Sequence, residues 1–235
     1  NESGFTTAGG VRPYRHTGNS ANEDHAVVPL DDGYLLLYVS ADHKLNWERY
    51  DATGAQVTDP GLAVGVVETD PPGGRVTSVD AALLPGGHLA VVTTTGAGTR
   101  LRLHDPETLA GGASVLVGRA LVHPVVVAGD GSGAGGSAGD GDAVAGWVVA
   151  GGHPDDPEAT DGLSRAVVSE VVVDGDGVRL GRQEAVTDVS GRGLDTVSAA
   201  AVDLASDTLV VTHLHRTTGE QRELRAVGVD TGALT

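Results

Sequence analysis

The stretch DDGYLLLYVSADHKLNWERYDATGAQV, residues 31–57, decides the fold of this chain. It opens on the turn Asp31-Asp32-Gly33, continues through a mostly apolar run, and passes a polar segment. It closes with an aromatic strand that ends in Asp51-Ala-Thr-Gly54. Two strands joined by a short polar turn are typical of a β-hairpin. The fold therefore depends on whether this hairpin occurs once or is repeated.

A second copy lies further along the chain. The stretch LLPGGHLAVVTTTGAGTRLRLHDPETL, residues 83–109, has the same order of turn, apolar run, polar turn and strand. Gly87 follows Gly33 by 54 residues, and Asp105 follows Asp51 by the same 54 residues. Equal spacing of matching residues indicates a repeated structural unit.

Two further copies are less regular. Residues 203–234 end in an Asp-Thr-Gly pattern like that of the first copy, and a copy at 123–174 is stretched by inserted loops. Each copy, with its flanking segments, is expected to form four strands. In the second copy these are residues 77–84, 88–95, 99–105 and 113–121. Repeats of about 40–55 residues with four strands each predict a β-propeller.

Composition agrees with an all-β fold. The chain has 235 residues, of which 40% are hydrophobic, mainly Val, Ala and Leu, and 36 are glycine. We therefore expect one β-propeller domain over residues 1–235, with about four four-stranded blades and a Gly/Asp-rich loop insertion at 129–142. An N-terminal strand within residues 4–14 is expected to pair with the last blade and close the ring. The alternatives are five blades, or a segment of a longer chain.

Charge and cysteine content exclude several classes of function. The formal net charge is −17, with a single lysine, so a nucleic-acid partner is not expected. The sequence contains no run of 18 apolar residues, so membrane insertion is not expected. The absence of cysteine excludes disulfides and thiolate metal sites. Because the chain begins at Asn1, we interpret it as a mature secreted protein or a segment of a longer one.

Residues 32–38, Asp-Gly-Tyr-Leu-Leu-Leu-Tyr, and 47–54, Trp-Glu-Arg-Tyr-Asp-Ala-Thr-Gly, resemble the repeats of bacterial secreted β-propeller proteins, several of which are lectins. The resemblance covers nearly the whole chain but describes blades more than activity. It implies a secreted, non-catalytic module that binds carbohydrate on cell surfaces or glycoproteins. One alternative is a protein-interaction propeller within a larger secreted assembly, such as an antibacterial toxin particle. The other is a propeller glycoside hydrolase.

The candidate site lies on one face of the predicted ring. In a propeller, the loops that lead into the first strands share a face with the loops that join second and third strands. The candidate ligand-binding residues on that face are His16, Asn22, Glu23, Asp24, Asp42, His43, Trp47, Arg75, Arg192, Asp195 and Arg216. Trp47 is expected to offer a stacking face for a sugar, while arginine and carboxylate groups bind its hydroxyls.

Catalytic and metal-binding motifs are not evident in the sequence. It contains no nucleophile elbow, no H-E-x-x-H and no phosphate-binding loop, so the sequence favours a protein without catalytic residues or cofactor. For the hydrolase alternative, carboxylates on the candidate face are Glu23, Asp24, Asp42, Asp70 and Asp195. No metal site is predicted: His213 and His215 share one side of a strand without an identifiable third ligand. The aspartates of the 129–142 loop are interpreted as solvated, with calcium binding as the alternative.

Overall fold

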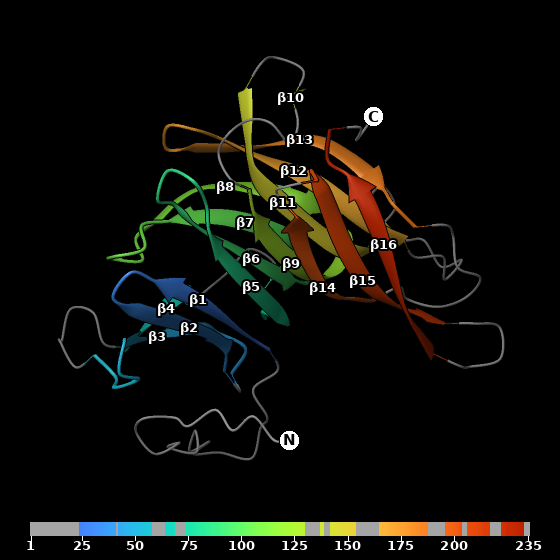
Figure 1. Ribbon diagram of the computed structural model, residues 1–235. Coiled ribbons are helices and arrows are strands. Elements are labelled where there is room, and N and C mark those ends of the chain that lie inside the picture. The colour runs from blue at the N-terminus through green and yellow to red at the C-terminus, as the bar shows by residue number, and fades with distance from the viewer. Residues whose placement is uncertain are drawn as a thin grey trace, which may run out of the picture.

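The described part of the chain is entirely built from β-strands and turns. The structure, a computed structural model, describes residues 24–40, 42–57, 64–68, 74–129, 137–138, 142–153, 165–187, 196–203, 206–216 and 222–232. These residues form four antiparallel sheets that follow one another along the chain (Figure 1). In this part of the chain, no helix has the length and apolar character needed to cross a membrane.

The strands of each sheet are consecutive in the sequence. Sheet 1 comprises β1 (His25–Leu30), β2 (Gly33–Val39), β3 (Leu45–Asp51) and β4 (Val64–Glu68). Sheet 2 comprises β5 (Ser78–Leu83), β6 (Leu89–Thr95), β7 (Gly98–His104) and β8 (Gly111–Gly118). Sheet 3 comprises β9 (Ala120–Ala128), β11 (Asp142–His153), β12 (Arg165–Asp174) and β13 (Gly177–Ala185), with β10 (Ser137–Ala138) paired to β11. Sheet 4 comprises β14 (Thr196–Asp203), β15 (Thr208–Arg216) and β16 (Arg222–Asp230).

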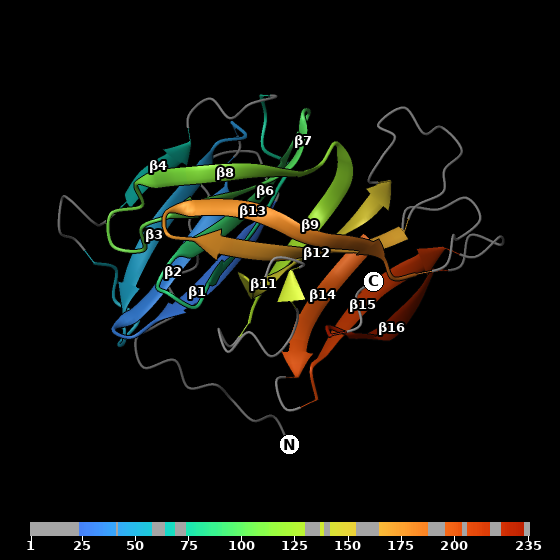
Figure 2. The ribbon, with the colours of Figure 1, turned by 90° about the horizontal axis from the view of Figure 1, so that it is seen from above.

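The first strands of the sheets lie side by side. β1 contacts β5, β5 contacts β9, and β9 contacts β14, so the sheets form an arc (Figure 2). Two contacts show that successive first strands begin on the same face. The carbonyl of His43, in the β2–β3 turn, accepts the N–H of Val76 just before β5, at 3.0 Å. Thr99, after the β6–β7 turn, donates from Oγ1 to the carbonyl of Leu121 at the start of β9, at 2.6 Å.

Three apolar cores hold adjacent sheets together. The first core, between sheets 1 and 2, includes Val28, Leu35, Leu37, Trp47, Val79 and Leu89. The second core, between sheets 2 and 3, includes Leu84, Val92, Leu101, Leu121, Val126 and Val148. The third core, between sheets 3 and 4, includes Val144, Trp147, Val149, Val168, Leu209 and Val211. Sheets 2 and 3 therefore contribute to two cores each, and sheets 1 and 4 to one.

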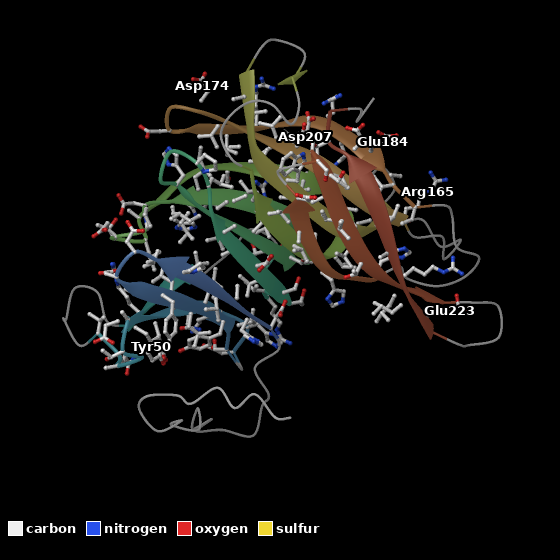
Figure 3. The ribbon with its side chains drawn as sticks, viewed as in Figure 1. Tyr50, Arg165, Asp174, Glu184, Asp207 and Glu223 are labelled. Carbon is white, nitrogen blue, oxygen red and sulfur yellow. The ribbon has the colours of Figure 1, made fainter. Side chains whose placement is uncertain are left out.

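The sheets at the two ends of the arc each leave one face uncovered by another described sheet. On sheet 1 this face carries Tyr34 and Tyr50, whose rings stack with centroids 4.9 Å apart, and Val27, which is 56% exposed. On sheet 4 it carries Leu224, which is 68% exposed. Figure 3 shows Tyr50 on the first sheet and Glu223 on the last, on opposite sides of the molecule.

The structure agrees with the coarse fold predicted from the sequence and leaves the finer part untested. The strands expected from the second copy match β5 to β8 within a few residues. Gly175 and Asp176 form a tight turn between β12 and β13, with φ of 55° at the glycine. In the described residues sheet 4 has three strands rather than four. Residues 4–14, expected to supply the fourth, lie outside the described residues, as does most of the 129–142 insertion.

Candidate functional site

One aspartate directly precedes the first strand of sheet 1, and another lies within the first strand of sheet 2. Asp24 directly precedes β1, and its Oδ1 accepts the backbone N–H of His25 at 2.9 Å. Its Oδ2 accepts the backbone N–H of Val79, in β5 of the neighbouring sheet, at 3.0 Å. The Asp24 carboxyl group therefore bridges two sheets and lies next to the residue that precedes Asp80.

Asp80 repeats this arrangement one sheet further along the arc. It lies within β5, and its Oδ2 accepts the backbone N–H of Val126, in β9, at 2.8 Å. Burial, partly offset by backbone hydrogen bonds and assisted by the negative charge of Asp24, raises the pKa of Asp80 from 3.8 to about 6. Asp80 is thus a carboxyl group that retains its proton at mildly acidic pH.

The pair has the chemistry needed for acid–base catalysis. Both residues are partly buried rather than fully enclosed. Two carboxyl groups in different environments can divide the roles of proton donor and proton acceptor, because each has its own affinity for the proton. The same hydrogen bonds also connect adjacent sheets, which gives each aspartate a structural role beside the chemical one.

Three of the sequence-predicted residues lie near the same face but in surface turns. Asp42 accepts a hydrogen bond from Ser40 Oγ at 2.5 Å and pairs with Lys44 Nζ at 2.6 Å. The hydrogen bond from Lys44, followed by that from Ser40, lowers the pKa of Asp42 to about 2. His43 occupies the turn with φ of 60°, and Arg75 is exposed just before β5.

The expectation that Trp47 offers a stacking face is wrong. Trp47 is 6% exposed and packs in the first core with Leu45 and Leu37. Side chains alternate along β3, so Trp47 shares the buried side of the strand with Leu45 and Arg49. An indole enclosed between two sheets has no face available for a sugar.

The remaining predicted residues cannot be placed as side chains. His16, Asn22, Glu23, Arg192 and Asp195 lie outside the described residues, and so does Asp70. Arg216 ends β15, and its side chain is not among those described. Of the predicted residues that the structure describes, Asp24 is the one whose charge acts on a second carboxyl group, Asp80.

Asp80 was missed by the sequence-based prediction. Its signal is a single acidic residue inside the apolar strand SVDAAL, where an unpaired charge is costly to bury. Such a residue needs a hydrogen-bond partner, which here is a backbone amide of the next sheet.

Comparison with known proteins extends this description. No family model matches the sequence, and no curated protein matches it significantly. Solved structures do match. An α-L-arabinofuranosidase from Podospora anserina, in complex with cellotriose, has a TM-score of 0.55 and 10% identity, covering 92% of this chain and 66% of that protein. An endo-arabinase from Bacteroides thetaiotaomicron has a TM-score of 0.55 and 11% identity, covering 92% and 78%.

A third match is the catalytic domain of an α-L-arabinofuranosidase from Coprinopsis cinerea, with a TM-score of 0.50, 10% identity and coverage of 92% and 66%. This chain therefore spans slightly less than two thirds of the length of the two arabinofuranosidases. Since all three similar structures are glycoside hydrolases, they overturn the expectation of a non-catalytic, lectin-like module. What the likeness establishes for this chain is an all-β fold of the propeller type.

Proposed function

We propose that this chain is a glycoside hydrolase domain that acts on arabinofuranosyl linkages, with Asp24 and Asp80 as its reacting carboxyl groups. The observation that carries the proposal is that Asp24 and Asp80 each bind a backbone amide of the next sheet and that the charge of Asp24 acts on Asp80. The fold shared with two arabinofuranosidases and an endo-arabinase supports the choice of substrate class.

The two environments suggest a division of roles. Hydrolysis of a glycosidic bond needs one group that protonates the leaving oxygen and one that activates water or attacks the sugar. Asp80, with its pKa raised to about 6, is suited to donate the proton. Asp24, directly before β1 and partly exposed, is suited to the second role.

The test compares three aspartate-to-asparagine variants on arabinan and on 4-nitrophenyl α-L-arabinofuranoside. Asn keeps an oxygen that accepts the N–H of Val79 or Val126, so neither Asp24→Asn nor Asp80→Asn is expected to lower the thermal midpoint of unfolding. Both are expected to lose at least about 100-fold in kcat/KM, which is the lower range for loss of an acid–base group. Asp31→Asn, in the exposed turn between β1 and β2, is the matched control and retains activity.

Two results would contradict the proposal. One is a folded wild-type chain that hydrolyses neither substrate. The other is hydrolysis that survives in both Asp24→Asn and Asp80→Asn, because the carboxyl groups would then serve only as contacts between sheets.

A further inference from the structure

The first strand of sheet 3 is distorted beside the candidate site. In the pairing of β9 with β11, Val122 lies opposite Gly151 and Val125 lies opposite Val149. Two residues of β9, His123 and Pro124, therefore face the single residue Ala150, which is a β-bulge. Bulges of this kind bend a strand and redirect a side chain.

The pattern of burial along β9 also indicates one extra residue in this strand. Leu121 and Val126 both pack in the second core although they are five residues apart, an odd separation that a regular strand places on opposite faces. Beyond the bulge, Val125 and Val127 face the third core. The bulge therefore lies between Leu121 and Val125, three residues or fewer from the amide that binds Asp80.

His123 takes a backbone conformation that is unfavourable for its type. Its φ is 49°, in the left-handed region where residues other than glycine are uncommon, and its imidazole side is exposed to solvent. A bulge with its first residue left-handed commonly has glycine there. Strain retained by a non-glycine residue is a marker of functional sites.

His123 lies close, along β9, to the residue whose amide binds Asp80. His123 precedes Val126 by three residues in β9, as Ser78 precedes Asp80 by two residues in β5, so both lie towards the start of their strands. Ser78 is 2% exposed, and its Oγ has no hydrogen-bond partner in the described structure. A β-bulge with an exposed histidine thus precedes the amide that binds Asp80, and an unsatisfied hydroxyl lies two residues before Asp80.

We propose that His123 is a substrate-binding residue of this site, whose imidazole hydrogen-bonds to a hydroxyl group of the furanosyl unit held beside Asp80. The proposal rests on the proposed function. It accounts for a strained histidine where glycine or asparagine fits the backbone more easily, since neither supplies an imidazole.

Two variants separate a role in binding from a role in folding. His123→Asn keeps a residue type that tolerates positive φ, and His123→Gly removes the strain. Both are expected to match or exceed the wild-type thermal midpoint. Both are also expected to lower kcat/KM on 4-nitrophenyl α-L-arabinofuranoside at least about tenfold, the discrimination that a lost hydrogen bond of about 1.4 kcal/mol produces. His88→Asn, in the β5–β6 turn at the other end of the strands, is the control.

A binding measurement keeps this proposal distinct from the proposed function. Calorimetric titration with α-1,5-arabinotriose is expected to give a dissociation constant raised at least tenfold in His123→Asn and unchanged in His88→Asn. If the wild-type chain binds arabinotriose through His123 but hydrolyses nothing, the proposed function fails and His123 remains a binding residue. If His123→Asn binds and hydrolyses like the wild type, the role of His123 is refuted. If the wild type neither binds nor hydrolyses, both proposals are refuted.

Discussion

Strand β6 of sheet 2 is buried along its whole length, whereas β2 of sheet 1 is buried only at Leu35, Leu37 and Val39. The same contrast separates β12 of sheet 3, nearly all of it buried, from β16 of sheet 4, most of whose described side chains are exposed. Strands with two covered faces become apolar on both sides, and strands with one covered face alternate. The burial of β6 and β12, compared with β2 and β16, thus follows whether the sheet is inside the arc or at one end.

One ion pair in sheet 3 and one in sheet 4 differ in burial in the same way. In sheet 3, Glu170 is fully buried, and its Oε1 accepts from Arg182 Nε at 3.0 Å and from an Arg182 terminal nitrogen at 2.7 Å. Its Oε2 accepts the Arg182 backbone N–H at 2.9 Å. In sheet 4, Glu223 pairs with Arg225 at 2.9 Å, but both side chains are 48% exposed. One pair is part of the interior and the other is at the surface.

The largest difference is expected from removing one carboxylate in each sheet. Glu170→Ala removes three hydrogen bonds to Arg182 and the fully buried carboxylate that accepts them, and it is expected to lower the free energy of unfolding by about 3–5 kcal/mol. Glu223→Ala is expected to change it by less than about 1 kcal/mol, because solvent screens the exposed pair. Urea denaturation measures both. Glu170→Gln, which keeps the shape, is the intermediate control, and equal effects of the two alanine variants would contradict the division.

Leucine truncation tests the same contrast without charge. Leu101, in β7, is fully buried in the second core, and Leu101→Ala is expected to cost about 2–5 kcal/mol of unfolding free energy. Leu224→Ala, on the uncovered face of sheet 4, is expected to change stability by no more than about 0.5 kcal/mol. A large loss from Leu224→Ala would show instead that this face is covered in solution.

The smallest expected effect concerns pH. The folded-state pKa of Asp80, about 6, lies above its unfolded value of 3.8, so folding favours the protonated form. The contribution of Asp80 to the free energy of unfolding is complete below about pH 3.8. It is lost as the pH rises through 6, a change of roughly 2–3 kcal/mol. Asp42, in a surface turn of sheet 1, has a lowered pKa and the opposite sign: its contribution is present above 3.8 and is lost as the pH falls towards 2.

Unfolding curves recorded from pH 3 to pH 7 test these signs. With rising pH, the free energy of unfolding of the wild type is expected to fall relative to that of Asp80→Asn. Relative to that of Asp42→Asn, it is expected to rise. If the Asp80→Asn difference is the same at pH 4 and pH 7, Asp80 does not titrate between them, and its assignment as the proton donor loses its basis.

Local patterns predicted the sheets but not their neighbours. The turn Asp31-Asp32-Gly33 and its counterpart at Gly87 locate hairpins, because turn chemistry depends on adjacent residues. The bonds from Val79 to Asp24 and from Val126 to Asp80 join residues 55 and 46 positions apart. Nothing in the local sequence of either strand specifies such a partner, so Asp24 was predicted as a site residue but its pairing was not.

Trp47 shows how a residue's type can mislead. A tryptophan among Asp42, Lys44 and Arg49 resembled an exposed aromatic in a polar segment. The side of a strand is set by alternation, however, and Leu45 lies on the same side as Trp47. Arg49 lies on that side too, and its charge hid the alternation of apolar and polar residues. Its guanidinium is buried and pairs with Asp32 at 3.0 Å. The bulge at His123 is likewise hidden, because it requires the register of β11.

The two tryptophans allow unfolding to be followed separately at two junctions between sheets. Trp47 lies in the first core and Trp147 in the third, so each indole senses a different junction between sheets. The chain has no other tryptophan. In a single-tryptophan variant the emission spectrum follows one end of the arc alone. Noncoincident transitions of the two variants would reveal an arc that unravels from one end, and coincident ones an arc that melts as a single cooperative unit.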